Sequence, residues 1–322
     1  MRRLLFSCAL LALAARTVNA QAATGSEGAL FLLLPTGAQA VGMGQAIVAG
    51  KPGSEGIWWN PSSIARQDKR ELAIHYSKTI AGTGTALSYV MKSRAHGTGA
   101  FSINLLDIGE QPIVDDNNQQ IGVIFPRDIV FAGTYAATLG KRLNLGLNYK
   151  LVQIRTDCSG ICTSVGAEVQ SSSAADLGAQ YQVRAGAPLT FGLAVRNLGG
   201  KLNSRETNQR DPLPTQVEFG AQYRLRFIDR YVKDTEVRAA ASYIDSRSFG
   251  GKAARFGTDL IYQGMVHLRA GYVGHDRRGD ASAALGFGLQ SGGFVFDIAR
   301  TFGGLPADNG QPPTYVSLRY LF

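Results

Sequence analysis

The chain has 322 residues, of which 45% are hydrophobic, 18% are charged and 39 are glycines. Three arginines lie in the first 20 residues, so the formal charge of +9 falls to +6 without them, and the remaining excess is spread along the chain. This distribution excludes a basic nucleic-acid-binding tail. No later stretch approaches the roughly 20 apolar residues that a transmembrane helix needs, which excludes a helical membrane protein.

The first 20 residues have the organisation of a secretory signal peptide. Residues 1–3 carry two arginines, an apolar stretch runs from Leu4 to Ala15, and small residues at Val18 and Ala20 suit a cleavage site. Cys8 lies inside the apolar stretch, which is not the position of a lipoprotein cysteine. We therefore predict that the chain is exported and cut after Ala20.

From residue 71 onward, apolar residues alternate with polar or small ones in segments of about ten residues, which is the period of a β-strand with one apolar face. Leu145, Leu147 and Tyr149, for example, alternate with Gly146 and Asn148. We predict fourteen strands, at 71–78, 84–91, 98–106, 128–139, 142–154, 174–183, 188–197, 214–226, 235–245, 253–262, 265–274, 281–290, 293–302 and 313–322.

Loop lengths favour a membrane barrel over a soluble β-sandwich, which the alternation alone would also allow. If the first strand runs outward from the periplasm, the long connections are all extracellular: 107–127, 155–173, 198–213 and 303–312. The periplasmic connections are short, at 140–141, 184–187, 263–264 and 291–292, with 227–234 as the longer exception. Long outer loops and short periplasmic turns are typical of outer-membrane barrels.

Aromatic residues support the same localisation, because tyrosine favours the interface between lipid and water. Seven tyrosines fall near predicted strand ends and populate two girdles: Tyr149, Tyr181, Tyr223, Tyr243, Tyr262, Tyr272 and Tyr320. The chain ends in an alternating strand with Tyr320 and Phe322 on one face, which resembles the signal read by the barrel assembly machinery. We therefore expect this machinery and outer-membrane lipid to be partners.

A membrane barrel must close, because lipid offers no hydrogen bonds to an open sheet edge. Charged residues then belong on the inner face, since an arginine or lysine at the lipid midplane costs roughly 2–4 kcal/mol. The alternation places five charged residues on the lumen side: Asp176, Glu218, Arg224, Asp259 and Arg269. Glycines on that side leave room for neighbouring groups to approach closely.

Cys158 and Cys162 are the cysteines that remain after cleavage of the signal peptide. A local disulfide is the favoured state in an oxidising compartment. A zinc site would need further cysteine or histidine residues close by, and none is near.

The segment before the strands carries Gly42-Met43-Gly44 and then Trp59-Asn60-Pro61. It resembles the PorV/PorQ family of outer-membrane proteins, relatives of the FadL-type transporters, in which a glycine-rich stretch leads to a Trp-Asn-Pro-Ala motif. The resemblance continues at residues 197–201, 211–214 and 268–272, and so spans most of the mature chain.

This resemblance implies a transmembrane antiparallel β-barrel of fourteen strands at 71–322, with residues 21–70 as an N-terminal plug, or hatch, anchored by a turn at Asn60-Pro61. The family usually has an Asp-Asp pair before the motif, whereas this chain has Lys51-Pro52-Gly53-Ser54-Glu55. Ser62 and Ser63 also replace the usual Ala-Gly. The resemblance therefore carries over the turn but no ion or ligand role for an acidic pair.

No catalytic constellation or metal motif stands out, so we expect no enzyme activity and no cofactor. The resemblance implies a shuttle that collects secreted proteins at the cell surface, with cargo and other secretion-system components as partners. Its candidate cargo sites are the 198–213 loop and the loop that contains Cys158 and Cys162. The alternatives are a FadL-like channel for hydrophobic small molecules, which needs an apolar pocket behind the hatch, and a mainly structural barrel.

Overall fold

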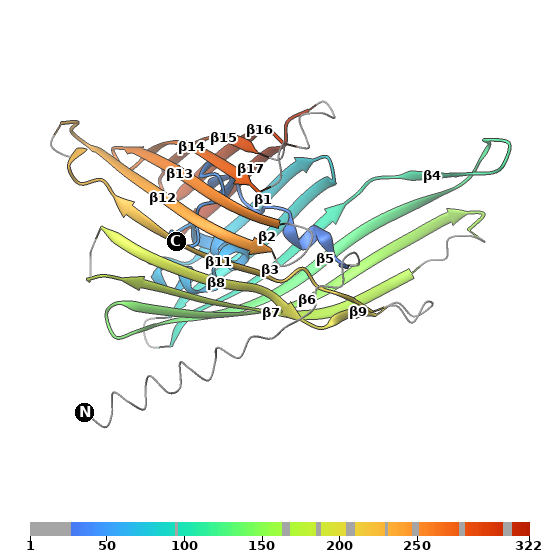
Figure 1. Cartoon of the computed structure of the whole chain (residues 1–322), viewed down its shortest axis with the longest axis horizontal. Helices are drawn as coiled ribbons and strands as arrows, with labels where there is room; N and C mark the ends of the chain where they lie inside the picture. Colours follow the sequence, from blue (N-terminus) through green and yellow to red (C-terminus); the bar gives the residue numbers. More distant parts are fainter. Residues whose placement is uncertain are drawn as a thin grey trace, which may run out of the picture.

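The computed structural model describes residues 27–93, 96–162, 168–184, 188–203, 210–228, 231–246, 251–276, 281–304 and 311–322. The predicted signal peptide lies outside these residues. The strands belong to a single antiparallel sheet that closes on itself, because β1 (Glu71–Thr79) pairs with β17 (Thr314–Leu321). Figure 1 shows the resulting barrel. No helix in the described part is long and apolar enough to cross a bilayer.

Fourteen of the strands form the wall, as predicted. Besides β1 and β17 these are β2 (Gly82–Ser93), β3 (Gly97–Asp107), β5 (Gln120–Leu139), β6 (Leu143–Gly160), β7 (Glu168–Gln182), β8 (Leu189–Gly199), β11 (Gln216–Arg224), β12 (Thr235–Ser246), β13 (Gly251–Tyr262), β14 (Val266–His275), β15 (Ser282–Ser291) and β16 (Phe294–Gly303). Three short strands lie in the long connections: β4 (Gln111–Val114), β9 (Lys201–Asn203) and β10 (Arg210–Pro212).

Side chains alternate between the two faces of the wall. In β6, Leu145, Leu147 and Tyr149 are exposed on the outside, whereas Asn148 and Lys150 are buried inside. All seven tyrosines predicted for the girdles are exposed: Tyr149, Tyr181, Tyr223, Tyr243, Tyr262, Tyr272 and Tyr320. The exposed surface of the wall is thus the apolar one, which is the arrangement that a lipid environment requires.

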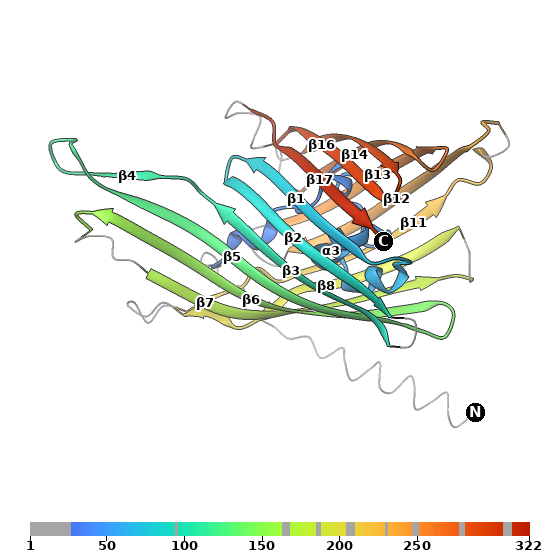
Figure 2. The same ribbon diagram turned by 180° about the vertical axis from the view of Figure 1, so that it is seen from behind.

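One side of the wall is much taller than predicted. β5 has 20 residues and β6 has 18, whereas strands of about 9–11 residues span a membrane. On the outward face, the polar residues Arg127 in β5 and Gln153 in β6 follow the apolar residues of the wall. We therefore place the strand residues beyond them above the lipid belt. We call β4 with residues 120–127 and 153–162 the blade, which projects from one end of the barrel in Figure 2. The blade was not predicted from the sequence because Pro126, Arg127 and Asp128 interrupt the apolar residues of β5, while backbone pairing continues past them.

We call residues 27–70 the hatch; its short helices, between residues 30 and 66, lie inside the barrel, and residues 68–70 are exposed at its end (Figures 1 and 2). The hatch consists of short turns of helix: η1 (Leu30–Leu33), α2 (Ala38–Gly42), η2 (Gly53–Glu55), α3 (Gly56–Trp59) and η3 (Pro61–Arg66). α2 contacts the wall at β14 to β17, and η3 contacts the opposite wall at β5, β6 and β7. The hatch therefore bridges the lumen from wall to wall.

Glycines on the inner wall allow the hatch backbone to come this close. A Cβ at Gly146 would collide with the backbone of Pro61 and Ser62, and a Cβ at Gly271 would collide with the backbone of Gly44. Gly44 itself has φ +57°, which disfavours other residues. The contact between hatch and wall is thus partly a contact of backbone with backbone.

We expect Gly146→Ala to destabilise the barrel by about 1–3 kcal/mol, because the added methyl group overpacks the seat of η3. Gly133→Ala is the matched control, since a Cβ there meets nothing within 4 Å. The control should be neutral or stabilising, because alanine restricts the unfolded chain more than glycine does. The stability of both variants is measured as the urea concentration at the unfolding midpoint of the bilayer-reconstituted protein. Heat-dependent gel mobility reports the folded fraction at each urea concentration. Equal midpoints for the two variants would contradict the close approach.

Candidate functional site: the hatch and its contacts in the lumen

Asn60 fixes the hatch to the wall at the predicted Asn-Pro turn. Its Nδ2 donates to the carbonyl oxygen of Val48 at 2.7 Å and reaches the wall carbonyl of Ala179 at 3.3 Å. Its Oδ1 accepts the Ser62 backbone N–H at 3.1 Å and the Ser62 hydroxyl at 2.7 Å, which caps η3. Pro61 occupies the first position of η3, where a missing N–H is harmless. Asn60 is fully buried, so each of these bonds replaces one to water.

Trp59 lies against two arginines from the wall. The guanidinium carbons of Arg196 and Arg255 are 5.1 and 5.6 Å from its ring centroid. Both arginines pair with Glu218, at 3.3 and 3.1 Å, and the indole N–H donates to the Thr36 carbonyl at 2.8 Å. Glu218, predicted on the lumen face, thus holds two cations over the aromatic face of the hatch.

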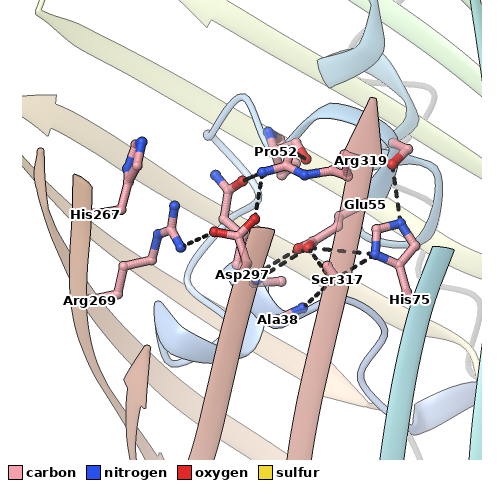
Figure 3. A network of polar contacts seen from close by, with 12 residues as sticks. Ala38, Pro52, Glu55, His75, His267, Arg269, Asp297, Ser317 and Arg319 are labelled. Carbon is pink, nitrogen blue, oxygen red and sulfur yellow. Dashed lines mark hydrogen bonds and ion pairs between the residues drawn. The ribbon is translucent and has the colours of Figure 1, made fainter. Parts of the chain in front are cut away.

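Glu55 holds the start of α2. Its carboxylate accepts the backbone N–H groups of Gln39 and Ala40, at 3.1 and 2.8 Å, and the Ser317 hydroxyl at 3.3 Å (Figure 3). A carboxylate at this position satisfies N–H groups that a helix leaves without partners. Burial raises the pKa of Glu55 to about 7, against the opposing effect of Arg319. Gly37 precedes α2 with φ +95°, and a Cβ there would collide with Glu55.

Asp297 joins two wall arginines in the same region. It pairs with Arg269 at 2.6 Å and Arg319 at 2.8 Å, and all three side chains are buried (Figure 3). Arg319 also donates to the Pro52 carbonyl at 3.1 Å and to Gln39 Oε1 at 2.9 Å. The predicted lumen residue Arg269 therefore belongs to a network that reaches the hatch through Arg319.

Asp176 organises a third polar cluster, between β6, β7 and β8. Its carboxylate lies 2.7 Å from Lys150 Nζ, accepts the backbone N–H of Asn197 at 2.7 Å, and accepts Asn148 Nδ2 at 3.0 Å. Asn148 also donates to the Ile57 carbonyl at 3.1 Å. This cluster links the wall to α3 of the hatch.

The remaining predicted residues border these anchors or lie outside them. Asp259 contacts Arg269 at 3.3 Å and His267 at 3.1 Å, while Arg224 lies at the short-turn end of the lumen, 3.3 Å from Glu236. Gly42 packs against Gly286 of the wall. Cys158 and Cys162 form a disulfide on the blade. Tyr320 and Phe322 stack on each other at a centroid distance of 5.5 Å.

Little free space remains between hatch and wall. The cavity there measures about 20 Å³, and Trp58, Trp59, Lys150, Arg196 and Arg255 are among the residues that line it. This volume holds about one water molecule, whereas small-molecule pockets usually measure roughly 300–1,000 Å³. Two larger hollows, of about 600 and 610 Å³, are lined by wall and loop residues and by no hatch residue. The apolar pocket that a hydrophobic-compound channel needs is thus absent from this part of the described structure.

The sequence did not identify several anchors, among them Glu55, His75, Asp297, Arg319 and Gln180. All but Glu55 are wall residues on the buried face, where the two-residue period does place them. His75 bonds Ser54 at 3.1 Å and Ser317 at 2.8 Å, and Gln180 donates to the Gly50 carbonyl at 2.7 Å. Their partners lie on other strands or on other turns of the hatch, and alternation along one strand does not show which of these polar residues meet.

We expect Asn60→Asp to destabilise the barrel by about 1–3 kcal/mol, because a buried carboxylate oxygen would replace the amide donor that faces the Val48 and Ala179 carbonyl oxygens, and the Val48 carbonyl would keep only its bond from Gln180. Asn117→Asp is the control, since Asn117 lies in an exposed turn. Urea unfolding in bilayers should shift for Asn60→Asp only. A shift of equal size in both variants would show that the added charge, rather than the lost bond, is responsible.

We expect Asp297→Asn to destabilise the barrel by about 3–5 kcal/mol, because two buried arginines lose their shared carboxylate. Asp68→Asn is the control, since Asp68 forms an exposed ion pair with Lys51 on the hatch. Protease protection of the hatch and the unfolding midpoint should both fall for Asp297→Asn. Retention of both would mean that the network does not hold the hatch.

Comparisons with known proteins agree with this architecture. Solved structures similar to the chain include the CymD monoaromatic hydrocarbon channel, with a TM-score of 0.58, 14% identity, and coverage of 90% of this chain and 98% of that one. The toluene transporter TodX of Pseudomonas putida has a TM-score of 0.60 at 13% identity, over 89% and 98% of the two chains. A FadL homologue of Pseudomonas aeruginosa has a TM-score of 0.53 at 12% identity, over 90% and 99%. At these identities the likeness shows the fold alone.

No curated protein matches the chain. The model of the family described as "Type IX secretion system protein PorV" matches residues 17–240, which is more than half of the chain. The resemblance in the glycine-rich and Trp-Asn-Pro segments is thereby confirmed, as are the fold and the localisation in the outer membrane. The chain belongs to the PorV family and is an outer-membrane β-barrel of FadL-like fold.

Proposed function

We propose that the chain carries secreted proteins at the outer surface of the outer membrane, as a component of type IX secretion. The observation that carries this proposal is the filled lumen, in which the hatch leaves a cavity of about 20 Å³. Because the cavity between hatch and wall is too small for a solute, we place the work of the protein at an end of the barrel. The family description supports the same conclusion.

The blade is the surface that we assign to cargo. It rises above the lipid belt as a single layer of sheet. The disulfide between Cys158 and Cys162 closes a local loop at the outer end of β6. Val114 and Ile161 are exposed there, at 49% and 55%. A single layer buries little apolar area by itself, so exposed apolar side chains at its tip favour a partner.

The 198–213 loop is the other candidate cargo site, and its described residues pack against the hatch instead of projecting from the barrel. Leu202 and Leu213 are buried with Ala29 of the hatch, and the Gly28 backbone N–H donates to the Pro212 carbonyl at 3.1 Å. This packing supports a role in covering the outer end of the hatch. We therefore propose that cargo contacts the blade first.

The proposal assigns the chain no catalytic step. It takes residues 1–20 as the signal peptide, 21–70 as the hatch and 71–322 as the barrel, with Tyr320 and Phe322 read by the assembly machinery. The second candidate, a channel for hydrophobic small molecules, is favoured by the likeness to hydrocarbon channels. The small cavity behind the hatch counts against it.

We expect the double variant Val114→Ser, Ile161→Ser to reduce surface delivery of secreted proteins at least several-fold in the native bacterium, because it removes apolar contact area from the blade. Ile80→Ser is the matched control, since Ile80 is 62% exposed in the β1–β2 turn outside the blade. Quantitative proteomics of the culture medium and cell surface measures delivery, with barrel abundance as the normalising value.

Normal delivery by the blade variant and by a strain lacking the gene would contradict the carrier function. Normal delivery by the blade variant alone, with loss in the deletion strain, would keep the function and remove the blade from it. Uptake of toluene that depends on this chain would instead favour the channel.

A further inference from the structure

The short-turn end of the barrel has a strongly basic rim. Seven cationic side chains are exposed around it: Lys69, Arg70, Lys141, Arg142, Arg184, Arg226 and Lys233. In the described part of this rim, the exposed acidic residues are Asp68 and Asp234. Short turns mark the periplasmic end of an outer-membrane barrel, so these cations face the inner leaflet and the periplasm.

The opposite end has a different distribution of charge. There, basic and acidic side chains are intermixed, and ion pairs join Arg127 to Asp107 at 3.7 Å and Arg155 to Asp157 at 2.9 Å. The imbalance at the periplasmic rim is therefore not shared by the described residues of the opposite end. A concentration of one sign at one end indicates a partner of the opposite sign.

The longest periplasmic connection, between β11 and β12, adds aromatic side chains to this rim. Phe227 and Tyr231 are 58% and 83% exposed, and they lie close in sequence to the exposed Arg226 and Lys233. The connection follows directly on Tyr223, one of the girdle tyrosines. Aromatic and basic residues together, just beyond a girdle, are typical of segments that lie among lipid headgroups.

We propose that the periplasmic rim is a binding surface for the phosphodiester groups of anionic phospholipids in the inner leaflet, with the β11–β12 connection seated among them. Ammonium and guanidinium groups attract phosphate charge, and a basic residue close to an anionic surface is worth roughly a fivefold gain in association. The attraction is screened within about 8 Å at physiological salt, so it acts only on lipids in contact with the rim.

The test is lipid selectivity of the reconstituted mature protein, measured by electron paramagnetic resonance with spin-labelled phosphatidylglycerol and phosphatidylcholine. We expect the association constant of the protein for phosphatidylglycerol to be about threefold that for phosphatidylcholine. This ratio should fall toward one in 1 M NaCl. The rim variant Lys141→Gln, Arg142→Gln, Arg184→Gln, Lys233→Gln should lose most of it. The control variant Lys78→Gln, Arg127→Gln, Lys201→Gln, Lys252→Gln removes four exposed cations from the other end and should retain it.

Equal loss in the two variants, or no selectivity in the wild type, would overturn the proposal. Crosslinking of an acidic periplasmic protein to the rim, lost in the rim variant while lipid selectivity is absent, would overturn it in favour of a protein partner. Heat-dependent gel mobility verifies that both variants fold, so a folding defect is separated from a loss of binding. Cargo delivery is not part of this readout, and the proposal stands or falls independently of the carrier function.

Discussion

The requirement that every backbone N–H and C=O find a partner within the protein determines this structure, because hydrocarbon offers none. The pairing of β1 with β17 satisfies the last open edge of the sheet. Once the sheet is closed, the two faces of each strand meet opposite environments, and polar side chains collect inside. The lumen of a barrel of this size is then a polar space that something must fill, and in this chain the hatch fills it.

The hatch is held mainly by polar groups and by close backbone approach. Its carbonyl oxygens at Val48, Gly50, Pro52 and Ile57 accept bonds from buried wall or hatch side chains. Buried ion pairs such as Asp297 with Arg319 add little net stability, since desolvation offsets most of their attraction. These ion pairs specify where the hatch sits, because a displaced hatch would leave those charges buried and unpaired. The hatch is therefore fixed in one placement rather than merely packed.

The sequence predicted the wall well and the interior poorly, for one physical reason. Alternation is local, so the two faces of β6 and the outward tyrosines follow from neighbouring residues. The polar partners inside are set by tertiary arrangement instead: Asp297 meets Arg269 and Arg319 from other strands, 28 and 22 positions away, and Ser317 reaches Glu55 across 262 positions. The Asn60-Pro61 turn was predicted from the family resemblance of its motif. The height of β5 was not predicted, because Pro126, Arg127 and Asp128 interrupt its apolar residues while backbone pairing continues on both sides of them.

The likeness to hydrocarbon channels and the filled lumen are consistent, because a fold does not fix a function. A FadL-like barrel transports a hydrophobic compound only if a pocket lies behind its hatch, and here Trp59 with its two arginines occupies that region. The wall then serves as a rigid frame with two chemically different ends. One end raises a single layer of sheet above the membrane, and the other presents cations to the inner leaflet. A protein that holds partners at one end benefits from a fixed position in the membrane at the other, so the filled space between hatch and wall and the two unlike rims are compatible with the proposed carrier function.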